Sequence, residues 1–146
     1  MNFKLATIEH RPVPLEVHIL ISQSDEEKIR QIIKLVHEEL KLTSSKGYRG
    51  QTIVFTNSRR KVNDIVDRIG NSFPRARPYH SGMTYSSRKR VEMEFSSGKC
   101  PVVVATYALG AGVDFPASQV IFESLMMGKD ILSPNMFHQR RKLRML

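Results

Sequence analysis

Three short stretches of the sequence carry residue types that suit phosphate binding. They are Thr56-Asn57-Ser58-Arg59, His80-Ser81-Gly82, and Thr106 followed by Gly110-Ala111-Gly112-Val113-Asp114. Hydroxyl groups and backbone amides of small residues approach a phosphate closely, and a helix that begins behind them adds partial positive charge. No row of aromatic, Asn or Gln side chains accompanies these stretches in the sequence. We therefore predict contacts to a sugar–phosphate backbone, with little discrimination among bases.

Positive charge is concentrated in the middle third of the chain. The net charge is +9 and the pI is about 10.0, which indicates a polyanionic partner. Residues 57–99 hold ten basic and four acidic side chains, with clusters at 59–61 and 88–90. Either cluster alone can be a solvated helix face. Because each follows a predicted strand, the pair favours a track for phosphates.

Several other chemistries are excluded by residue type and spacing. Gly98-Lys99 and Gly128-Lys129 lack the remaining positions of a phosphate loop, and Gly110-Ala111-Gly112 lacks the third small residue of a dinucleotide fingerprint. The five histidines and Cys100 have no zinc spacing. Ser81 beside His80 is not a nucleophile pair, because adjacent side chains rarely face each other. We predict no metal site and no complete catalytic constellation.

Hydrophobic periodicity predicts strands that alternate with helices. Strands are expected over residues 13–21, 51–56, 76–80, 102–105 and 119–123, and helices are expected to begin at Ser24, at Asn57 or Ser58, at Thr84 and at Pro134. This alternation is typical of an α/β fold with a parallel sheet of about five strands, covered on both faces. Ligands of such sheets bind outside the carboxyl ends of the strands, so the three polar stretches are expected to meet at one edge.

Length and composition predict one domain that spans residues 1–146. The chain is 40% hydrophobic and 25% charged, which is enough for a self-standing core at this length. Its single cysteine, Cys100, fits a reducing compartment. No apolar run approaches the roughly 20 residues of a membrane span. We therefore expect a cytoplasmic protein with no membrane partner.

These same stretches resemble helicase motifs. Residues 51–59 look like motif IV, residues 80–95 look like the segment that follows it, and residues 104–116 are very similar to motif V. From about Arg11 to Gln139, the sequence resembles the second RecA-like motor domain of superfamily-two DExH-box helicases, most closely the archaeal superkiller-like branch. The resemblance implies a RecA-like parallel sheet of about five or more strands with helices on both faces.

The resemblance also implies roles for individual residues. ATP with Mg would be shared with a first RecA-like domain, and Gly112, Asp114 and Gln139 would face the ATP cleft. A single strand of DNA or RNA would contact Thr56, Asn57, Ser58, Arg59, His80, Ser81, Gly82, Arg88 and Thr106. Alternatives stay open: the glycines can serve a tight turn, Asp114 can cap that turn, and Arg88 can be solvated.

One part of the sequence departs from the family pattern. Phe137-His138-Gln139 matches the start of motif VI, but the arginines that should follow fall at positions 143 and 146, and both are leucine. An arginine finger contributes a factor of about a thousand or more to hydrolysis. We expect a chain truncated or altered after Gln139 that is inactive alone and binds no nucleotide tightly without the phosphate loop of a first domain.

Three functions compete at this point. The first is the C-terminal motor half of an ATP-dependent helicase. The second is a non-catalytic nucleic-acid-binding module with a helicase-derived fold, which the altered tail and the +9 charge favour. The third is a regulator that binds a small nucleotide at residues 110–114.

Overall fold

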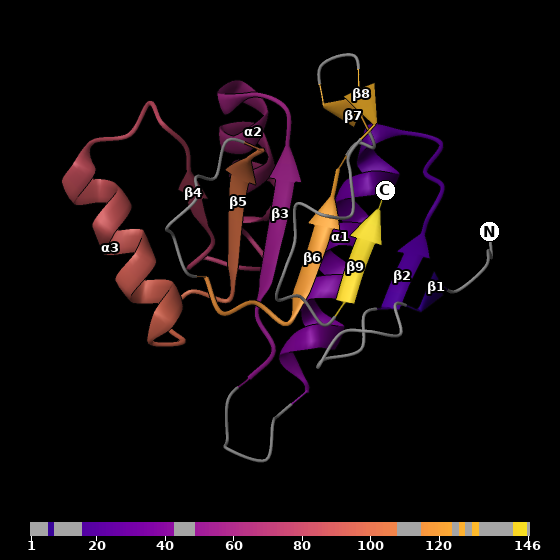
Figure 1. Ribbon diagram of the computed structural model, residues 1–146, viewed down its shortest axis with the longest axis horizontal. Helices are drawn as coiled ribbons and strands as arrows, with labels where there is room; N and C mark the ends of the chain where they lie inside the picture. The colour runs from indigo at the N-terminus through magenta and orange to yellow at the C-terminus, as the bar shows by residue number, and fades with distance from the viewer. Residues whose placement is uncertain are drawn as a thin grey trace.

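A computed structural model describes residues 6–7, 16–42, 49–107, 115–123, 126–127, 130–131 and 142–145, and these form an α/β fold around one twisted sheet (Figure 1). The sheet strands are β1 (Ala6–Thr7), β2 (Glu16–Ile19), β3 (Thr52–Thr56), β4 (Arg77–Tyr79), β5 (Val102–Thr106), β6 (Gln119–Phe122) and β9 (Lys142–Met145). Their order is β1-β2-β9-β6-β3-β5-β4. Only the β1–β2 pair is antiparallel among the pairs of this sheet. The predicted parallel α/β sheet is confirmed.

Three helices begin at the residues that the sequence predicts. They are α1 (Asp25–Leu40), α2 (Arg59–Ile69) and α3 (Tyr85–Ser96). The hydroxyl of Ser24 accepts the backbone N–H of Glu27, and the Glu27 carboxylate accepts that of Gln23 at 2.8 Å. Ser58 and Thr84 cap the other two helices in the same way. Each cap satisfies a backbone donor that the first helical turn leaves free.

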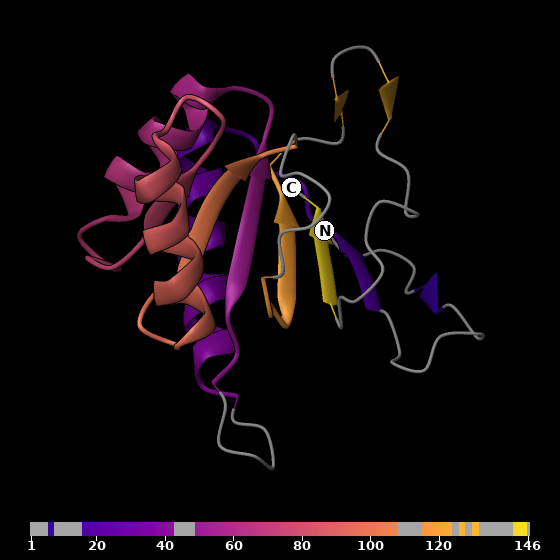
Figure 2. The ribbon, with the colours of Figure 1, turned by 60° about the vertical axis from the view of Figure 1, so that its left-hand side comes forward.

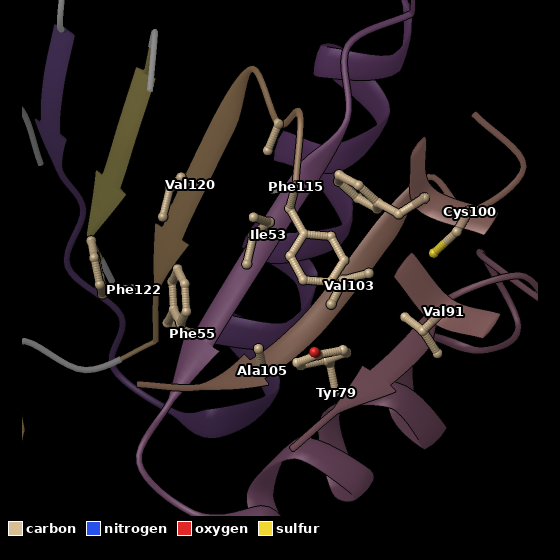
Figure 3. Packing of buried hydrophobic residues seen from close by; sticks show 12 residues of the cluster. Ile53, Phe55, Tyr79, Val91, Cys100, Val103, Ala105, Phe115, Val120 and Phe122 are labelled. Atoms are coloured by element: carbon tan, nitrogen blue, oxygen red, sulfur yellow. The ribbon is translucent and has the colours of Figure 1, made fainter. Parts of the chain in front are cut away.

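Helices cover both faces of the sheet. Val54 and Val104 pack with residues of α1 and α2, which lie along one face (Figure 2). Their neighbours Ile53 and Val103 point to the other face and pack with α3. Figure 3 shows this second cluster, in which the ring of Phe115 lies among residues of β3, β5 and β4. Because successive side chains of each strand point to opposite faces of the sheet, the strands pack against two cores, and this packing holds the strand ends in place.

Some predictions fall outside the described residues, and four of the observed strands, β1 among them, were not predicted. The helix expected at Pro134 and the first residues of the first strand lie outside them. Strand β9 lies between β2 and β6 and runs parallel to both. Two further short strands, β7 (Met126–Met127) and β8 (Asp130–Ile131), pair separately. Among the described helices, none has the length and apolar character needed to cross a bilayer.

Candidate nucleic-acid interface

The described residues that follow β3, β5 and β4 lie at one edge of the sheet, as the sequence predicts, whereas residues 110–114 of the third stretch lie outside the described residues. In the sheet, β5 lies between β3 and β4. Thr56 pairs with Thr106, and Tyr79 pairs with Ala105, so the strands end at the same level. The residues that follow therefore lie side by side at the upper end of the strands in Figure 1. We call this edge, residues 57–59, 80–82 and 106–107, the strand-end rim.

A hydrogen-bonded cluster joins the start of α2 to the turn after β4. Arg59 Nη2 donates to Ser81 Oγ at 2.8 Å, and the Gly82 N–H donates to His80 Nδ1 at 3.1 Å. A Cβ at Gly82 would lie 3.1 Å from His80 Nδ1 and 3.2 Å from Arg59 Nη1, so the cluster is packed tightly around glycine. Arg59, Ser81 and Gly82 are exposed. The cluster presents a guanidinium, a hydroxyl and an imidazole together toward solvent.

The protonation state of His80 follows from this geometry. Because Nδ1 accepts the Gly82 N–H, the ring is neutral and carries its proton on Nε2. Partial burial, and next the positive charge of Arg59, lower the pKa of His80 below its ordinary value of 6.5. A neutral His80 can donate one hydrogen bond from Nε2 to an oxygen at the rim.

Thr56 requires a correction. Its side chain is fully buried, and its hydroxyl donates to Glu123 Oε2 at 2.9 Å. The prediction that the Thr56 side chain contacts nucleic acid is therefore wrong for this structure, because no face of the hydroxyl reaches the surface. Its register partner Thr106 is only half-buried, and Asn57 is exposed. These two residues, with Ser58 as the α2 cap, remain at the rim.

Arg88 is partly shielded from solvent. It lies on α3, is half-buried, and its Nε is shielded from water without a hydrogen-bond partner among the described residues. Nearby, a 2.6 Å hydrogen bond from Tyr79 is the main cause that lowers the pKa of Glu92, and the charge of Arg88 adds to it in the same direction. Burial, and next this bond, raise the pKa of Tyr79 to about 12. A contact of Arg88 with phosphate stays a prediction.

Glu123 is a site residue that sequence reasoning missed. It follows β6, its side chain is 7% exposed, and Oε1 lies 3.1 Å from Lys28 Nζ and 3.5 Å from Lys61 Nζ. Burial by itself raises the pKa of Glu123. The hydrogen bonds from Lys28 and Thr56 and the charges of both lysines outweigh burial and hold the pKa below 4.5. The ionised carboxylate thus ties the first turns of α1 and α2 to the end of β3. A charged residue directly after a buried strand is the signal for it.

The residues expected at the ATP cleft lie outside the described part of the chain. Gly112, Asp114 and Gln139 all fall in undescribed segments, so no geometry is assigned to a nucleotide or to Mg. Among the described residues, no three His, Cys, Asp or Glu side chains gather closely enough to hold a metal ion.

Comparison with known families shows to which family the chain belongs. Residues 27–142 match the family described as the helicase conserved C-terminal domain. The chain belongs to this family, which confirms the resemblance drawn from residues 51–59 and 104–116. It is 45% identical to a probable ATP-dependent helicase of Methanocaldococcus jannaschii over 139 residues, which are 95% of this chain and 17% of that protein. It is 32% identical to the ATP-dependent DNA helicase RecQ of Haemophilus influenzae over 67% of this chain and 16% of that protein.

Solved structures share the fold. The Mycobacterium smegmatis helicase Lhr, bound to ssDNA and AMP-PNP, superposes with a TM-score of 0.64 at 19% identity, over 92% of this chain and 19% of that one. Saccharomyces cerevisiae Dbp5, bound to RNA and ADP BeF3, superposes with a TM-score of 0.68 at 17% identity, over 90% of this chain and 34% of that one. The chain thus spans about a third or less of each of these four proteins.

Proposed function

We propose that this chain is the C-terminal motor half of an ATP-dependent DNA or RNA helicase. It holds the sugar–phosphate backbone of a single strand at the strand-end rim and completes an ATP site together with a first RecA-like domain. Family membership and the similarity to helicases of two organisms support the motor assignment. The proposal that this chain binds the nucleic-acid backbone rests on one observation, which is that Arg59, Ser81 and Thr106 lie together at one edge of the sheet.

The chemistry of the rim suits phosphate better than bases. Arg59 supplies a charged fork that can contact phosphate oxygens while it still donates to Ser81. The neutral His80 adds one further donor, and the start of α2 contributes partial positive charge. Such contacts fix the path of a strand but carry no sequence information. The affinity for a strand is therefore expected to depend little on its base sequence.

Binding of fluorescein-labelled dT15 and rU15 to the full chain, followed by anisotropy, tests the grip. We expect Arg59→Ala to weaken both probes about 5-fold, and Thr106→Ala to weaken both about 3-fold, as loss of one phosphate contact predicts. Arg68→Ala is the matched control, since Arg68 lies on the same helix, about 13 Å from Arg59 along its axis, and pairs with Asp64. Equal affinities for Arg59→Ala and Arg68→Ala would contradict the proposal.

A non-catalytic nucleic-acid-binding module is the second candidate. Leu143 occupies a position where the family resemblance implies an arginine, and it lies in β9, paired with both Val17 and Val120. ATP hydrolysis stimulated by single-stranded nucleic acid separates the two candidates when it is measured with a first RecA-like domain present. Stimulation that depends on this chain supports the motor half, whereas strand binding without stimulation supports the module.

A further inference from the structure

A groove of about 600 Å³ lies at the end of the sheet opposite to the strand-end rim. Its walls are the α2–β4 loop at residues 72–75, the α3–β5 loop at residues 96–99, and the segment before β3. These loops enter β4, β5 and β3, so the length of a five-residue strand, about 15 Å, separates the groove from the rim. A ligand in this groove is therefore distinct from the nucleic acid proposed to bind at the strand-end rim.

The walls of the groove are positively charged. Arg49, Arg75 and Lys99 line it, and none of the described lining residues is acidic. Each of these three side chains is exposed and forms no ion pair within the described ranges. Arg77, two residues further along, differs because it is held by Glu94 at 2.8 Å. Three uncompensated cations around one cavity favour an anionic ligand.

The remaining lining suits a peptide better than a nucleic acid. Pro74 and Pro101 contribute apolar surface, whereas Phe73 is only 4% exposed, so its ring is no platform for a base. The backbone N–H groups of Gly98 and Lys99 are already donated to α3 carbonyls, at 3.1 and 2.9 Å. Hence no free amide of these two residues is left for phosphate. Positively charged side chains beside apolar proline surface are complementary to a segment in which carboxylates flank a bulky apolar side chain.

The floor of the groove is fixed before any ligand binds. Gln51 is buried, and its Nε2 donates to the carbonyl oxygens of Phe95 at 2.8 Å and Cys100 at 2.7 Å. Gly98 turns the α3–β5 loop with a φ of +80°, a conformation that favours glycine. A site that is already shaped loses little conformational entropy on binding.

We propose that this groove docks a segment of a partner protein in which acidic side chains flank a bulky apolar one. Arg75 and Lys99 bind the carboxylates, and the apolar side chain rests on Pro74 and Pro101. Docking here is independent of the proposed function, because the strand-end rim lies at the other end of the sheet.

The test measures anisotropy of three fluorescein-labelled probes with the full chain at physiological salt. The first is a twelve-residue peptide of Asp and Glu around one Phe and one Leu, the second replaces both apolar residues by Ser, and the third is dT15. The variants are Lys99→Glu and Arg75→Glu. Lys34→Glu is the control, since Lys34 is exposed on α1, does not line the groove, and undergoes the same change of charge. A circular dichroism melt verifies that each variant folds. If Lys99→Glu does not fold, Lys99→Gln replaces it.

We expect Lys99→Glu and Arg75→Glu each to weaken the first peptide at least about 5-fold, with Lys34→Glu within 2-fold of wild type. The Ser-substituted peptide binds about 10-fold more weakly than the first, and dT15 affinity stays within 2-fold in both groove variants. The proposal is overturned if the first peptide does not saturate below 1 mM, or if Lys99→Glu and Lys34→Glu weaken it equally. A loss of dT15 binding in Lys99→Glu without a loss of peptide binding would instead assign the groove to nucleic acid.

Discussion

Replacing Glu123 by glutamine tests the charged anchor beneath the strand-end rim. The substitution keeps the shape and an oxygen that can accept from Thr56, but it removes the negative charge that faces Lys28 and Lys61. Removing one partner of a fully buried ion pair costs about 3–5 kcal/mol. Lys28 is 22% exposed and Lys61 is 49% exposed, so both ammonium groups regain part of their hydration. We therefore expect Glu123→Gln to lower the free energy of unfolding by about 2 kcal/mol.

The same geometry sets the order of two companion variants. Lys28 is more buried than Lys61 and lies closer to the carboxylate. Lys28→Met is expected to cost about 1–2 kcal/mol, whereas Lys61→Met, which breaks a half-exposed pair, is expected to cost less than about 1 kcal/mol. Urea unfolding at pH 7, followed by circular dichroism, measures all three, because urea does not screen charges as guanidinium does.

The pH dependence gives a second, independent readout. The pKa of Glu123 is held below 4.5 in the folded chain, so its ionisation stabilises the fold above the unfolded-state pKa. That contribution is lost as pH falls from about 4.5 through the lower folded-state pKa. The stability difference between wild type and Glu123→Gln should be constant above about pH 5.5 and shrink below pH 4.5. A Glu123→Gln loss smaller than that of Lys61→Met, or a difference unchanged at low pH, would refute this reasoning.

Two further predictions concern the core and the loops. Cys100 is fully buried, and burial raises the pKa of its thiol to about 12. We therefore expect a disulfide reagent at pH 8 to react at least about 100-fold faster with the urea-unfolded chain than with the folded one. Comparable rates would contradict this packing. A Cβ at Gly50 would collide with the carbonyl oxygen of Glu39, whereas a Cβ at Gly98 meets nothing within 4 Å but requires a φ of +80°. In urea unfolding, Gly50→Ala should thus cost about 3 kcal/mol and Gly98→Ala only about 1 kcal/mol, and the reverse order would count against this loop geometry.

Local signals allowed much of the fold to be predicted from the sequence. Ser24 with Glu27, and Ser58 after an apolar run, mark helix starts through their own hydroxyls, so the caps needed no tertiary information. The short apolar runs that contain Val54 and Val104 are typical of strands buried on both faces. Because parallel strands end at a common edge, the position of Asn57, Ser81 and Thr106 at one edge also followed from the sequence.

Long-range contacts could not be predicted in this way. Strand β9 alternates Lys142 and Arg144 with apolar residues, but the pattern is only four residues long and continues a basic run, so it was not recognised as a strand. Its place in the sheet follows from pairing with β2 and β6. The partners of Glu123 are 62 to 95 positions away in the sequence. For the same reason the burial of Thr56, which removes it from the interface, became visible only in three dimensions.

The arrangement of the strand-end rim is tested most directly by a titration of the ¹⁵N-labelled chain with dT15, followed residue by residue in ¹H–¹⁵N spectra. We expect the largest shifts at residues 57–59, 80–82 and 106–107, and no shift of the amide signals of residues 96–99 at the opposite end of the sheet. Shifts that cluster at residues 96–99, or that spread evenly over the basic surface, would contradict the assignment of the rim as the backbone grip.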